Sequence, residues 1–328
     1  MNNDLPNLRE LLAPYPAYNI VGHVRPDGDC IGSAVALSCY LSKIGKRGYV
    51  IRTDAISSNF EYFFADVPTV NLENLNRDLP LICVDCSDRA RIGEELGKLE
   101  RPFLVIDHHK SNKGFAATDI IFPDIASTAE ILAHLFEHIK FQLDKKMAEA
   151  LYLGILTDTG RFAHNTTIDT FRYAQQMLQA GVDPSKIYSI VYENNSLCRY
   201  RLLERLLANI DLFSKNRACI SHLLASDLAE VGGCPSDTEG FVNYTRELAG
   251  VLVGCYVEYH DTFVKCSMRS VDRSLRLDLL AEKLGGGGHA CAVGFIADPQ
   301  TFSLENLKEK IDSHINKFYD EYIAARKS

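Results

Sequence analysis

Three short apolar runs, each ending at a cluster of aspartate and histidine, constrain the fold of this chain more than any other feature. The runs cover residues 18–22, 81–84 and 103–106. Each has the length and composition of a buried β-strand. In an open parallel sheet, ligands gather outside the carboxyl ends of the strands. We therefore predict that these clusters, which are far apart in sequence, meet at one end of a parallel sheet.

The clusters contain ligands for divalent metal ions. A fourth acidic segment at residues 157–160 adds to them, and the aspartates of the four segments are Asp27, Asp29, Asp85, Asp88, Asp107 and Asp158. Carboxylate oxygens with a few imidazoles suit Mn²⁺ or Mg²⁺ better than structural Zn²⁺. Without cations, so many carboxylates would raise one another's pKa. Two divalent ions would neutralise the cluster, with Asp85 as the bridge, and such a pair can activate a water for displacement at phosphorus.

The order of predicted elements indicates an α/β protein. Strands and helices alternate up to residue 122, which favours a mainly parallel N-terminal sheet with helices on both faces. Helices then dominate up to residue 193, and an amphipathic helix follows at residues 198–213. Further strands and helices beyond residue 216 indicate a second, smaller α/β domain. The predicted organisation is a metal-binding catalytic domain at 1–193, a helical linker at 194–215 and a substrate-binding domain at 216–328.

Composition limits the possible partners and the compartment. The formal net charge of the 328-residue chain is −8, which argues against binding long nucleic acid, because that requires many phosphates to be neutralised. A short anionic substrate remains compatible with this charge. No apolar stretch reaches about 18 residues, so we expect no membrane span. The ten cysteines form no dense framework, and no secretory signal is visible, so we expect reduced thiols and a cytoplasmic protein.

A glycine-rich segment in the second half predicts a phosphate site. Residues 285–289 are four glycines followed by a histidine. Consecutive free backbone N–H groups form nests that bind anions. Arg269 can pair bidentately with a phosphate, and His289 can hydrogen-bond the same group or stack on a base.

Two other motifs are expected to have no role in catalysis. Cys83 and Cys86 form a C-x-x-C pair without a second pair, so we predict packing residues. His134, Glu137 and His138 match a metalloprotease-like pattern, but no third ligand is evident. We predict that they lie on a solvated helix face.

Taken together, these motifs resemble the DHH phosphoesterase family, which is named for the tripeptide Asp107-His108-His109, and the second half resembles its DHHA1 partner domain. The matching positions there are Arg269, Ser270, residues 237–243 and the glycine-rich segment. The most similar subgroup is the NrnA-type nano-RNases. One departure is Val293, which replaces a small alanine after the glycine-rich segment and is expected to influence nucleotide choice.

The resemblance implies a role for each matching residue. His23, Asp27 and Asp85 would hold one metal ion, and Asp29, Asp85, His108 and Asp158 the other. His109 would face the substrate phosphate as a catalytic group, and Asp107 would orient a histidine. Asp88 would support the site or cap the next helix. The substrate-binding residues would be Arg269, Ser270, Gly286, Gly287, Gly288 and His289.

The implied activity is metal-dependent hydrolysis of very short RNA and of 3′-phosphoadenosine 5′-phosphate (pAp). A hydroxide activated by two ions would attack phosphorus; Mn²⁺ is expected, with Mg²⁺ or another divalent ion as the alternative. A second hypothesis keeps the chemistry but takes linear or cyclic dinucleotides such as pApA or c-di-AMP. A third is a binding module that only senses nucleotides or metal. Family members often form homodimers, although no residue here establishes a dimer.

Overall fold

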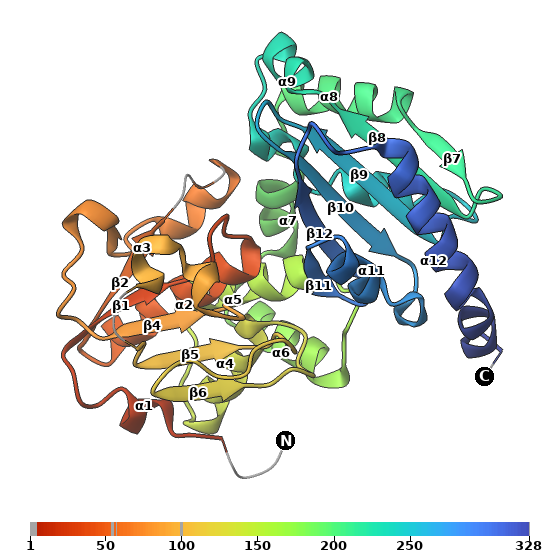
Figure 1. Cartoon of the computed structure of the whole chain (residues 1–328). Coiled ribbons are helices and arrows are strands. Elements are labelled where there is room, and N and C mark those ends of the chain that lie inside the picture. The colour runs from red at the N-terminus through yellow and green to blue at the C-terminus, as the bar shows by residue number, and fades with distance from the viewer. Residues whose placement is uncertain (1–4, 54–55, 57, 99–100, 328) are drawn as a thin grey trace. The chain divides into compact units, whose positions relative to one another are not determined.

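The protein is described by a computed structural model that covers residues 5–53, 56, 58–98 and 101–327. The chain divides into two compact units, residues 1–194 and 195–328 (Figure 1).

A six-stranded parallel sheet forms the centre of the first unit, in the order β3-β2-β1-β4-β5-β6. Every neighbouring pair of strands in it is parallel. The strands are β1 (Ala17–Val21), β2 (Arg47–Arg52), β3 (Thr69–Asn71), β4 (Leu81–Val84), β5 (Leu104–Asp107) and β6 (Thr118–Ile121). The order places β1, β4 and β5, the three strands that precede acidic clusters, side by side in the middle of the sheet. The predicted parallel sheet is therefore confirmed.

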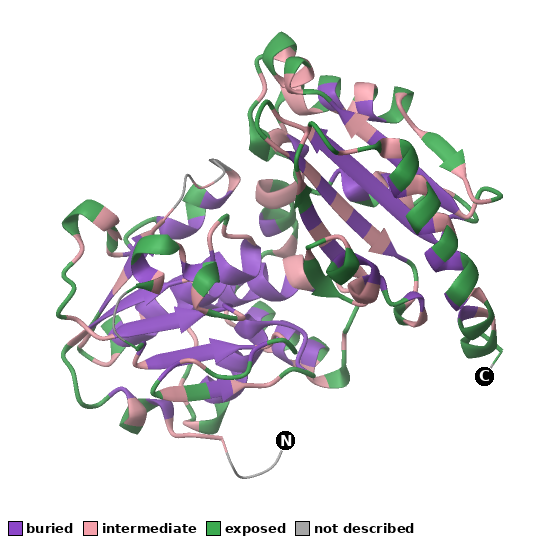
Figure 2. Ribbon diagram, in the orientation of Figure 1, coloured by how far each residue is buried: buried purple, intermediate pink, exposed green. Residues whose placement is uncertain are grey.

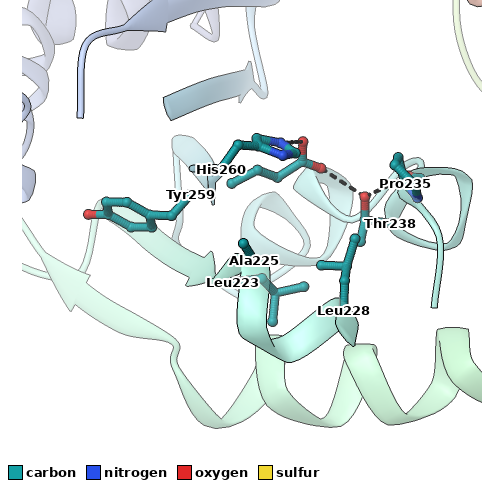
Figure 3. A pocket seen from close by; sticks show the side chains of 8 residues that line it. Leu223, Ala225, Leu228, Pro235, Thr238, Tyr259 and His260 are labelled. Atoms are coloured by element: carbon teal, nitrogen blue, oxygen red, sulfur yellow. Dashed lines mark hydrogen bonds and ion pairs between the residues drawn. The ribbon is translucent and has the colours of Figure 1, made fainter. Parts of the chain in front are cut away.

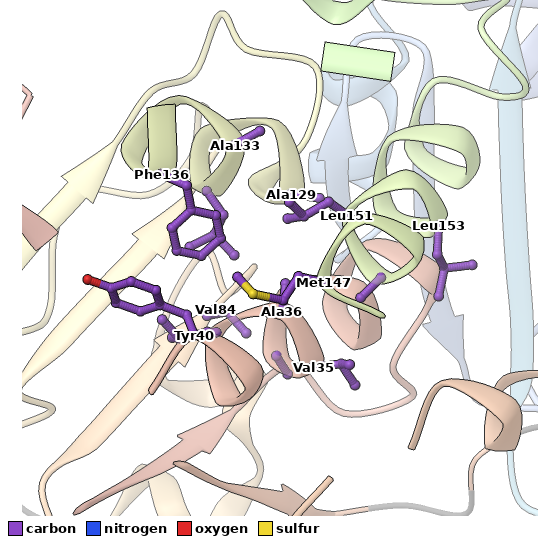
Figure 4. Packing of buried hydrophobic residues seen from close by; sticks show 14 of the residues in the cluster. Val35, Ala36, Tyr40, Val84, Ala129, Ala133, Phe136, Met147, Leu151 and Leu153 are labelled. Atoms are coloured by element: carbon purple, nitrogen blue, oxygen red, sulfur yellow. The ribbon is translucent and has the colours of Figure 1, made fainter. Parts of the chain in front are cut away.

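Helices cover both faces of this sheet, as predicted, but to different extents. The helices α2 (Gly28–Lys43), α4 (Thr128–His138) and α5 (Lys145–Asp158) pack on one face. Figure 4 shows Tyr40, Phe136 and Met147 pointing toward one another in this core. Over the part of the chain that the structure describes, the other face is covered mainly by short elements, η3 (Arg89–Ile92) and α3 (Glu94–Gly97), through Ile92 and Leu96, with Leu72 and Ala116 beside them. The strands between the two layers are almost wholly buried (Figure 2).

The remaining described helices of the first unit also contribute to its packing: Leu8, Phe63, Tyr173 and Ile187 from four of them are buried in the same core. These helices are α1 (Leu8–Leu11), η1 (Ser58–Phe64), η2 (Leu72–Asn74), α6 (Ile168–Gln179) and α7 (Pro184–Tyr192).

The contact between α2 and α5 is unusually close because α5 carries a glycine there. A Cβ atom on Gly154 would lie 2.6 Å from Oδ1 of Asp29 and 2.5 Å from Cβ of Ala129. Real Cβ atoms do not approach other atoms so closely, so only glycine fits at this position. The packing brings the N-terminus of α2 beside the C-terminal half of α5, and with it two of the predicted metal ligands.

The second unit has a six-stranded mixed sheet in the order β11-β12-β10-β9-β8-β7. Strands β8 and β9 pair in parallel, and all other pairs are antiparallel. The strands are β7 (Asp211–Phe213), β8 (Ala218–Leu223), β9 (Val253–Tyr259), β10 (Val264–Ser270), β11 (Gly287–His289) and β12 (Ala292–Ala297).

Each face of this second sheet packs against a different set of helices. One face forms a core with η5 (Arg273–Leu275), α11 (Leu277–Lys283) and α12 (Leu304–Ala325). On the other face, α8 (Leu197–Ala208) and α10 (Val242–Arg246) pack around Tyr256 of β9. The elements α9 (Ala225–Val231) and η4 (Pro235–Thr238) lie next to α8.

The structure differs from the sequence-based expectation at residues 194–215. The predicted helical linker instead supplies α8 and β7 of the second unit. Helix α8 ends at Ala208, and β7 then pairs with β8. Leu202 and Leu206 are fully buried, so the apolar face of α8 covers the second sheet. The strands β7, β11 and β12 were not predicted. The first two have only three residues, and β11 lies in a glycine-rich run, so neither has a clear strand periodicity; β12 has six residues directly after that run.

Among the described residues, none of the helices combines the length and the apolar composition needed to cross a membrane.

Candidate metal centre

The carboxyl ends of the three central strands carry the predicted ligands of the first unit. His23 follows β1 after one residue, Asp85 directly follows β4, and His108 directly follows β5. Asp29 lies in the first turn of α2, and Asp158 is the last residue of α5. All six residues predicted to hold metal thus come together in space, in the arrangement that parallel strands favour.

Three sets of side chains offer ligand atoms that all lie within 4.8 Å of one another: His23, Asp27 and Asp85; Asp29, His108 and Asp158; and Asp85, His108 and His109.

Asp85 and His108 each belong to two of these sets and connect them. Nε2 of His23 lies 3.5 Å from Oδ2 of Asp85, and Nε2 of His108 lies 3.6 Å from Oδ1 of the same carboxylate. Nε2 of His108 is also 3.3 Å from Oδ2 of Asp158. The two oxygens of Asp85 therefore face different histidines, which is the geometry expected of a carboxylate that bridges two cations.

The backbone of Asp85 turns sharply to reach this position. Its φ is +58°, in the left-handed region that few residues other than glycine, asparagine and aspartate adopt. Its N–H donates to the carbonyl of Ile106 on β5 at 3.0 Å, which holds the turn in place. Unusual backbone of this kind is concentrated at functional sites.

The turn before α2 fixes the two aspartates on either side of Gly28. Asp27 is the N-cap of the helix, and its Oδ1 accepts hydrogen bonds from the N–H groups of Asp29 at 3.0 Å and Cys30 at 3.1 Å. Its other oxygen lies 3.7 Å from Nε2 of His23. Capping thus leaves one oxygen of Asp27 directed at the histidine.

Helix α4 adds a contact that the sequence analysis missed. Thr128 donates its N–H to Oδ2 of Asp29 at 2.7 Å and its hydroxyl to Oδ1 of Asp85 at 3.1 Å. The N–H of Ala129 donates to the other oxygen of Asp29 at 2.9 Å. The sequence around Ser127 was identified only as a capping box, and Ser127 does cap this helix. A cap signal alone gives no sign that two N–H groups of this helix bind Asp29 and that the Thr128 hydroxyl binds Asp85.

Hydrogen bonds also set the orientation of the three histidines. Nδ1 of His23 lies 2.9 Å from the carbonyl of Val24, and Nδ1 of His108 lies 3.3 Å from the carbonyl of Ile125. A carbonyl only accepts, so Nδ1 carries the proton and Nε2 is left with a lone pair for a metal ion. Nδ1 of His109 lies 2.7 Å from Oδ1 of Asp107, the contact predicted for that aspartate.

Asp107 is itself held on both sides. Its second oxygen accepts from Nδ2 of Asn112 at 2.7 Å, and its side chain is fully buried. Because Asp107 fixes Nδ1 of His109, the imidazole presents Nε2 to any bound ligand. Asp88 instead caps η3 by accepting from the N–H groups of Ala90 and Arg91.

The pKa values of the side chains in the centre are shifted in the direction that indicates an excess of negative charge. Burial, followed by repulsion from Asp85, raises the pKa of Asp29 and of Asp158 well above the ordinary range. Burial disfavours protonation of His23, but its contacts with Asp27 and Asp85 outweigh that effect and raise its pKa to about 10. So many carboxylates in one partly buried place repel one another, and divalent cations bound among them would neutralise that charge. The donor set therefore fits hard divalent ions such as Mn²⁺ or Mg²⁺.

The predicted phosphate residues of the second unit lie around β10, β11 and β12. Gly287, Gly288 and His289 form β11 at the sheet edge and are exposed, so this part of the predicted loop is an edge strand. An edge strand leaves one row of backbone N–H groups free for an anion. Gly286 precedes it, and Arg269 pairs in register with Ala292, which in turn pairs with His289.

Ser270 and Val293 lie on the face of the sheet opposite to Arg269. Ser270 is buried, alternates with Arg269 on β10, and donates its hydroxyl to the carbonyl of Asp272 at 3.0 Å. Val293 is also buried and packs in the core with α11 and α12. Strand alternation turns Val293 away from the face that carries Arg269, so any influence on nucleotide choice would be indirect, through the packing of β12.

The C-x-x-C pair and the metalloprotease-like motif contribute neither to the metal centre nor to the predicted phosphate residues of the second unit. Cys83 and Cys86 are buried free thiols whose pKa is raised by burial. His134 is buried and lies 2.7 Å from the hydroxyl of Tyr173, so its prediction as solvated was wrong, whereas Glu137 and His138 are exposed. The reason is that α6 packs over α4.

A cavity of about 20 Å³ lies in the second unit between α9, η4 and β9 (Figure 3). Thr238 beside it donates to Glu258 at 2.8 Å. The space suits one water molecule and lies apart from the predicted site residues.

Comparison with known proteins agrees with this arrangement. Residues 18–155 match the DHH family, N-terminal domain. The chain is 29% identical to the bifunctional oligoribonuclease and PAP phosphatase NrnA of Thermus thermophilus, over 90% of this chain and 88% of that protein. It is 25% identical to the cyclic-di-AMP phosphodiesterase PdeA of Listeria monocytogenes, over 86% of this chain and 45% of that protein.

A solved structure has the same fold over nearly the whole length. The crystal structure of an exopolyphosphatase-related protein from Bacteroides fragilis superposes with a TM-score of 0.85 at 26% identity and covers 94% of each chain. Residues 18–155 therefore match a DHH family domain, and nearly the whole chain is similar in sequence to the Thermus thermophilus NrnA protein and in fold to the Bacteroides fragilis protein.

Proposed function

We propose that this protein hydrolyses very short RNA oligonucleotides and pAp, with two Mn²⁺ ions at the centre formed by the first unit. The observation that carries the proposal is the pair of ligand sets joined by Asp85: His23, Asp27 and Asp85 for one ion, and Asp29, Asp85, His108 and Asp158 for the other. The relative from Thermus thermophilus, whose name gives both activities, supports the choice of substrate.

The reaction needs both charge neutralisation and a proton donor. Two divalent ions, when bound, would activate a water and stabilise charge on the phosphoryl oxygens. We assign His109 to the substrate phosphate, because Asp107 holds its Nδ1 at 2.7 Å and so fixes the orientation of the ring beside the metal ligands. In this role Nε2 would donate to the phosphate or to the leaving oxygen. Burial opposes protonation of His109, but Asp107 outweighs it and raises the pKa to about 9, so the ring carries the proton that it would donate.

We assign substrate binding to the second unit. Arg269, His289 and the backbone of Gly287 and Gly288 would supply donors for a phosphate. The N–H of Gly286 already donates to the carbonyl of Ala281 at 2.8 Å, so for Gly286 we propose only that its lack of a side chain leaves room for the phosphate. For Ser270 we propose an indirect role: its hydroxyl holds the backbone of Asp272 near Arg269 and does not touch the substrate.

The test is release of mononucleotides from RNA of two to five nucleotides and of AMP from pAp. The protein, stripped with a chelator, is assayed with Mn²⁺, Mg²⁺ or no added metal. We expect activity only with metal, highest with Mn²⁺, and no cleavage of long RNA. Calorimetric titration with Mn²⁺ counts the ions. Absence of product from every short substrate would refute the proposal, and full activity without metal would refute the assigned centre.

An alternative activity is hydrolysis of linear or cyclic dinucleotides such as pApA or c-di-AMP. The similarity to PdeA favours it, although the chain spans less than half of that protein. Side-by-side kcat/KM values for pAp, short RNA, pApA and c-di-AMP distinguish the two. A value for c-di-AMP above that for short RNA would reverse our assignment.

Two broader features are also proposed. We infer a reducing, cytoplasmic compartment from the ten cysteines, all of which are free thiols; cell fractionation tests this. We also propose a homodimer, as is common in the family, and light scattering coupled to gel filtration would give its mass.

A further inference from the structure

We propose that Arg246, at the end of α10, is a second guanidinium of the phosphate site in the second unit and that, with Arg269, it selects substrates ending in a phosphate monoester. This inference rests on the proposed function. It adds a residue that the sequence analysis did not identify, and it specifies which short substrates the site prefers.

The sheet register places the relevant positions in one row. Arg269 on β10 pairs with Gly254 on β9 and with Ala292 on β12, and Ala292 pairs with His289 on β11. Residues that are directly paired across strands project from the same face of a sheet. The row therefore runs across four strands, with Arg269 near its centre and His289 at its outer end.

Helix α10 reaches this row because β9 carries a glycine there. A Cβ atom on Gly254 would lie 2.5 Å from the backbone nitrogen of Arg246, so the end of the helix rests directly on this position. Arg246 is thereby next to the residue whose cross-strand partner is Arg269. The proximity also has an electrostatic effect: burial, and then the charge of Arg246, lowers the pKa of Arg269.

Neither guanidinium has an acidic partner among the residues that the structure describes. Nε of Arg246 is buried without a hydrogen-bond partner. The guanidinium of Arg269 donates from Nη1 to the carbonyl of Met268 at 3.0 Å. Two adjacent, partly buried cations without a counter-charge are unfavourable unless an anion joins them.

Small side chains leave room for such an anion beside the arginines. On the face that carries Arg269, the neighbouring positions of β10 and β12 are Ser267, Gly294 and Ala292. Within the second unit, α8 and α10 pack on this face around β8 and β9, whereas α11 and α12 fill the opposite face. The half of the face over β10, β12 and β11 is therefore lined by donors and by small residues.

A purely structural role explains less. A cation at the C-terminal end of a helix interacts favourably with the helix dipole, but that would not require a buried Nε or a second guanidinium beside it. Two guanidiniums offer several N–H donors to one group, which suits a phosphate monoester, with its two negative charges, better than a singly charged diester.

The test compares the dinucleotides ApA, pApA and ApAp with the metal-loaded, full-length protein. Including both phosphorylated forms allows for either polarity of attack. In the wild type we expect one terminal phosphate to raise kcat/KM. Arg246→Met, which keeps an unbranched stem and removes the charge, should reduce that preference about tenfold or more while changing kcat/KM for ApA less than about twofold. The matched control is Arg201→Met, since Arg201 is an exposed arginine on α8 of the same unit.

A binding measurement separates recognition from catalysis. In the presence of a chelator, calorimetry with pAp should show weaker affinity for Arg246→Met than for the wild type and Arg201→Met. Arg246→Lys retains a charge but not the forked donors, so its affinity for pAp should be intermediate. If circular dichroism shows that Arg246→Met is unfolded, Arg246→Lys takes its place in both measurements.

The outcomes distinguish this inference from the proposed function. If the wild type cleaves none of these substrates, short RNA or pAp, the proposed function fails. If it cleaves them but shows no preference for a terminal phosphate, or if Arg246→Met and Arg246→Lys keep that preference, the role of Arg246 is refuted while the proposed function stands.

Discussion

The two units collect charge of opposite sign by two different routes. In the first, carboxylates from separate segments meet where neighbouring parallel strands end; Asp29 and Asp85 are buried there, and Asp27 and Asp158 are partly buried. In the second, Arg269 lies in a row of paired positions on one face of a mainly antiparallel sheet, and Arg246 of α10 lies beside that row. The comparison shows that strand ends suit a compact ion site that tolerates little change, whereas a sheet face suits an extended anion that only needs matching donors.

Asp85→Asn breaks the first arrangement most severely. Asparagine tolerates the left-handed backbone at this position, so we expect a folded protein in which the bridging charge is lost. Hydrolysis of pAp should fall by about 10³-fold or more, as for other groups essential to catalysis, and Mn²⁺ affinity should fall with it. Kinetics and calorimetry measure both.

Asp88→Asn is the matched control for that prediction. Asp88 is exposed and caps η3, so its substitution should leave activity within about threefold. Equal losses in the two variants would contradict the special role of Asp85.

Gly154→Ala tests whether helix packing positions the ligands. The new Cβ would lie 2.6 Å from Oδ1 of Asp29, and overpacking of this kind costs about 1–3 kcal/mol. We expect a lower melting temperature and activity reduced by about 10²-fold, because a displacement of about 1 Å at a reacting centre has that effect.

Gly287→Ala provides the comparison in the second unit. Nothing lies within 4 Å of a Cβ atom at this position, so we expect an unchanged melting temperature and at most a change in KM. A drop in stability as large as that of Gly154→Ala would contradict the contrast between a packed centre and an open face.

Thr128→Val examines the support that α4 gives to the centre. Valine keeps the shape and the N–H bond to Asp29 but removes the hydroxyl bond to Asp85. Loss of such an outer contact typically costs about 10–100-fold in metal affinity or activity. Thr128→Ser, which restores the hydroxyl, should recover most of the Mn²⁺ affinity in a titration. Failure of serine to rescue would indicate that only the shape of the side chain matters.

Arg269→Lys should give the smallest effect. A lysine retains the charge but not the planar pair of donors, so we expect KM for pAp to rise about tenfold with kcat nearly constant. Steady-state kinetics separates the two parameters, and melting curves control for folding. A fall in kcat at unchanged KM would place Arg269 in the chemical step instead.

Most of the first unit was predictable because its signals are local. Apolar runs with acidic ends predicted β1, β4 and β5. The second unit was less predictable. Three features depend on contacts with distant segments: the packing of α8 in the second unit, the strand conformation of residues 287–289 and the burial of Val293. Local sequence periodicity does not predict such contacts.

The sequence by itself determined the chemistry of this protein: which oxygen and nitrogen ligands are present, that they follow strands, and that a glycine-rich segment accompanies an arginine. Only the tertiary structure decided that Asp85 lies between two ligand sets, that Thr128 donates to two remote aspartates, and that Arg246 rests beside Arg269. The physical reason is that residue type and periodicity are properties of a segment. The distances that let remote groups share an ion or a phosphate are set by the close approach of whole helices and strands.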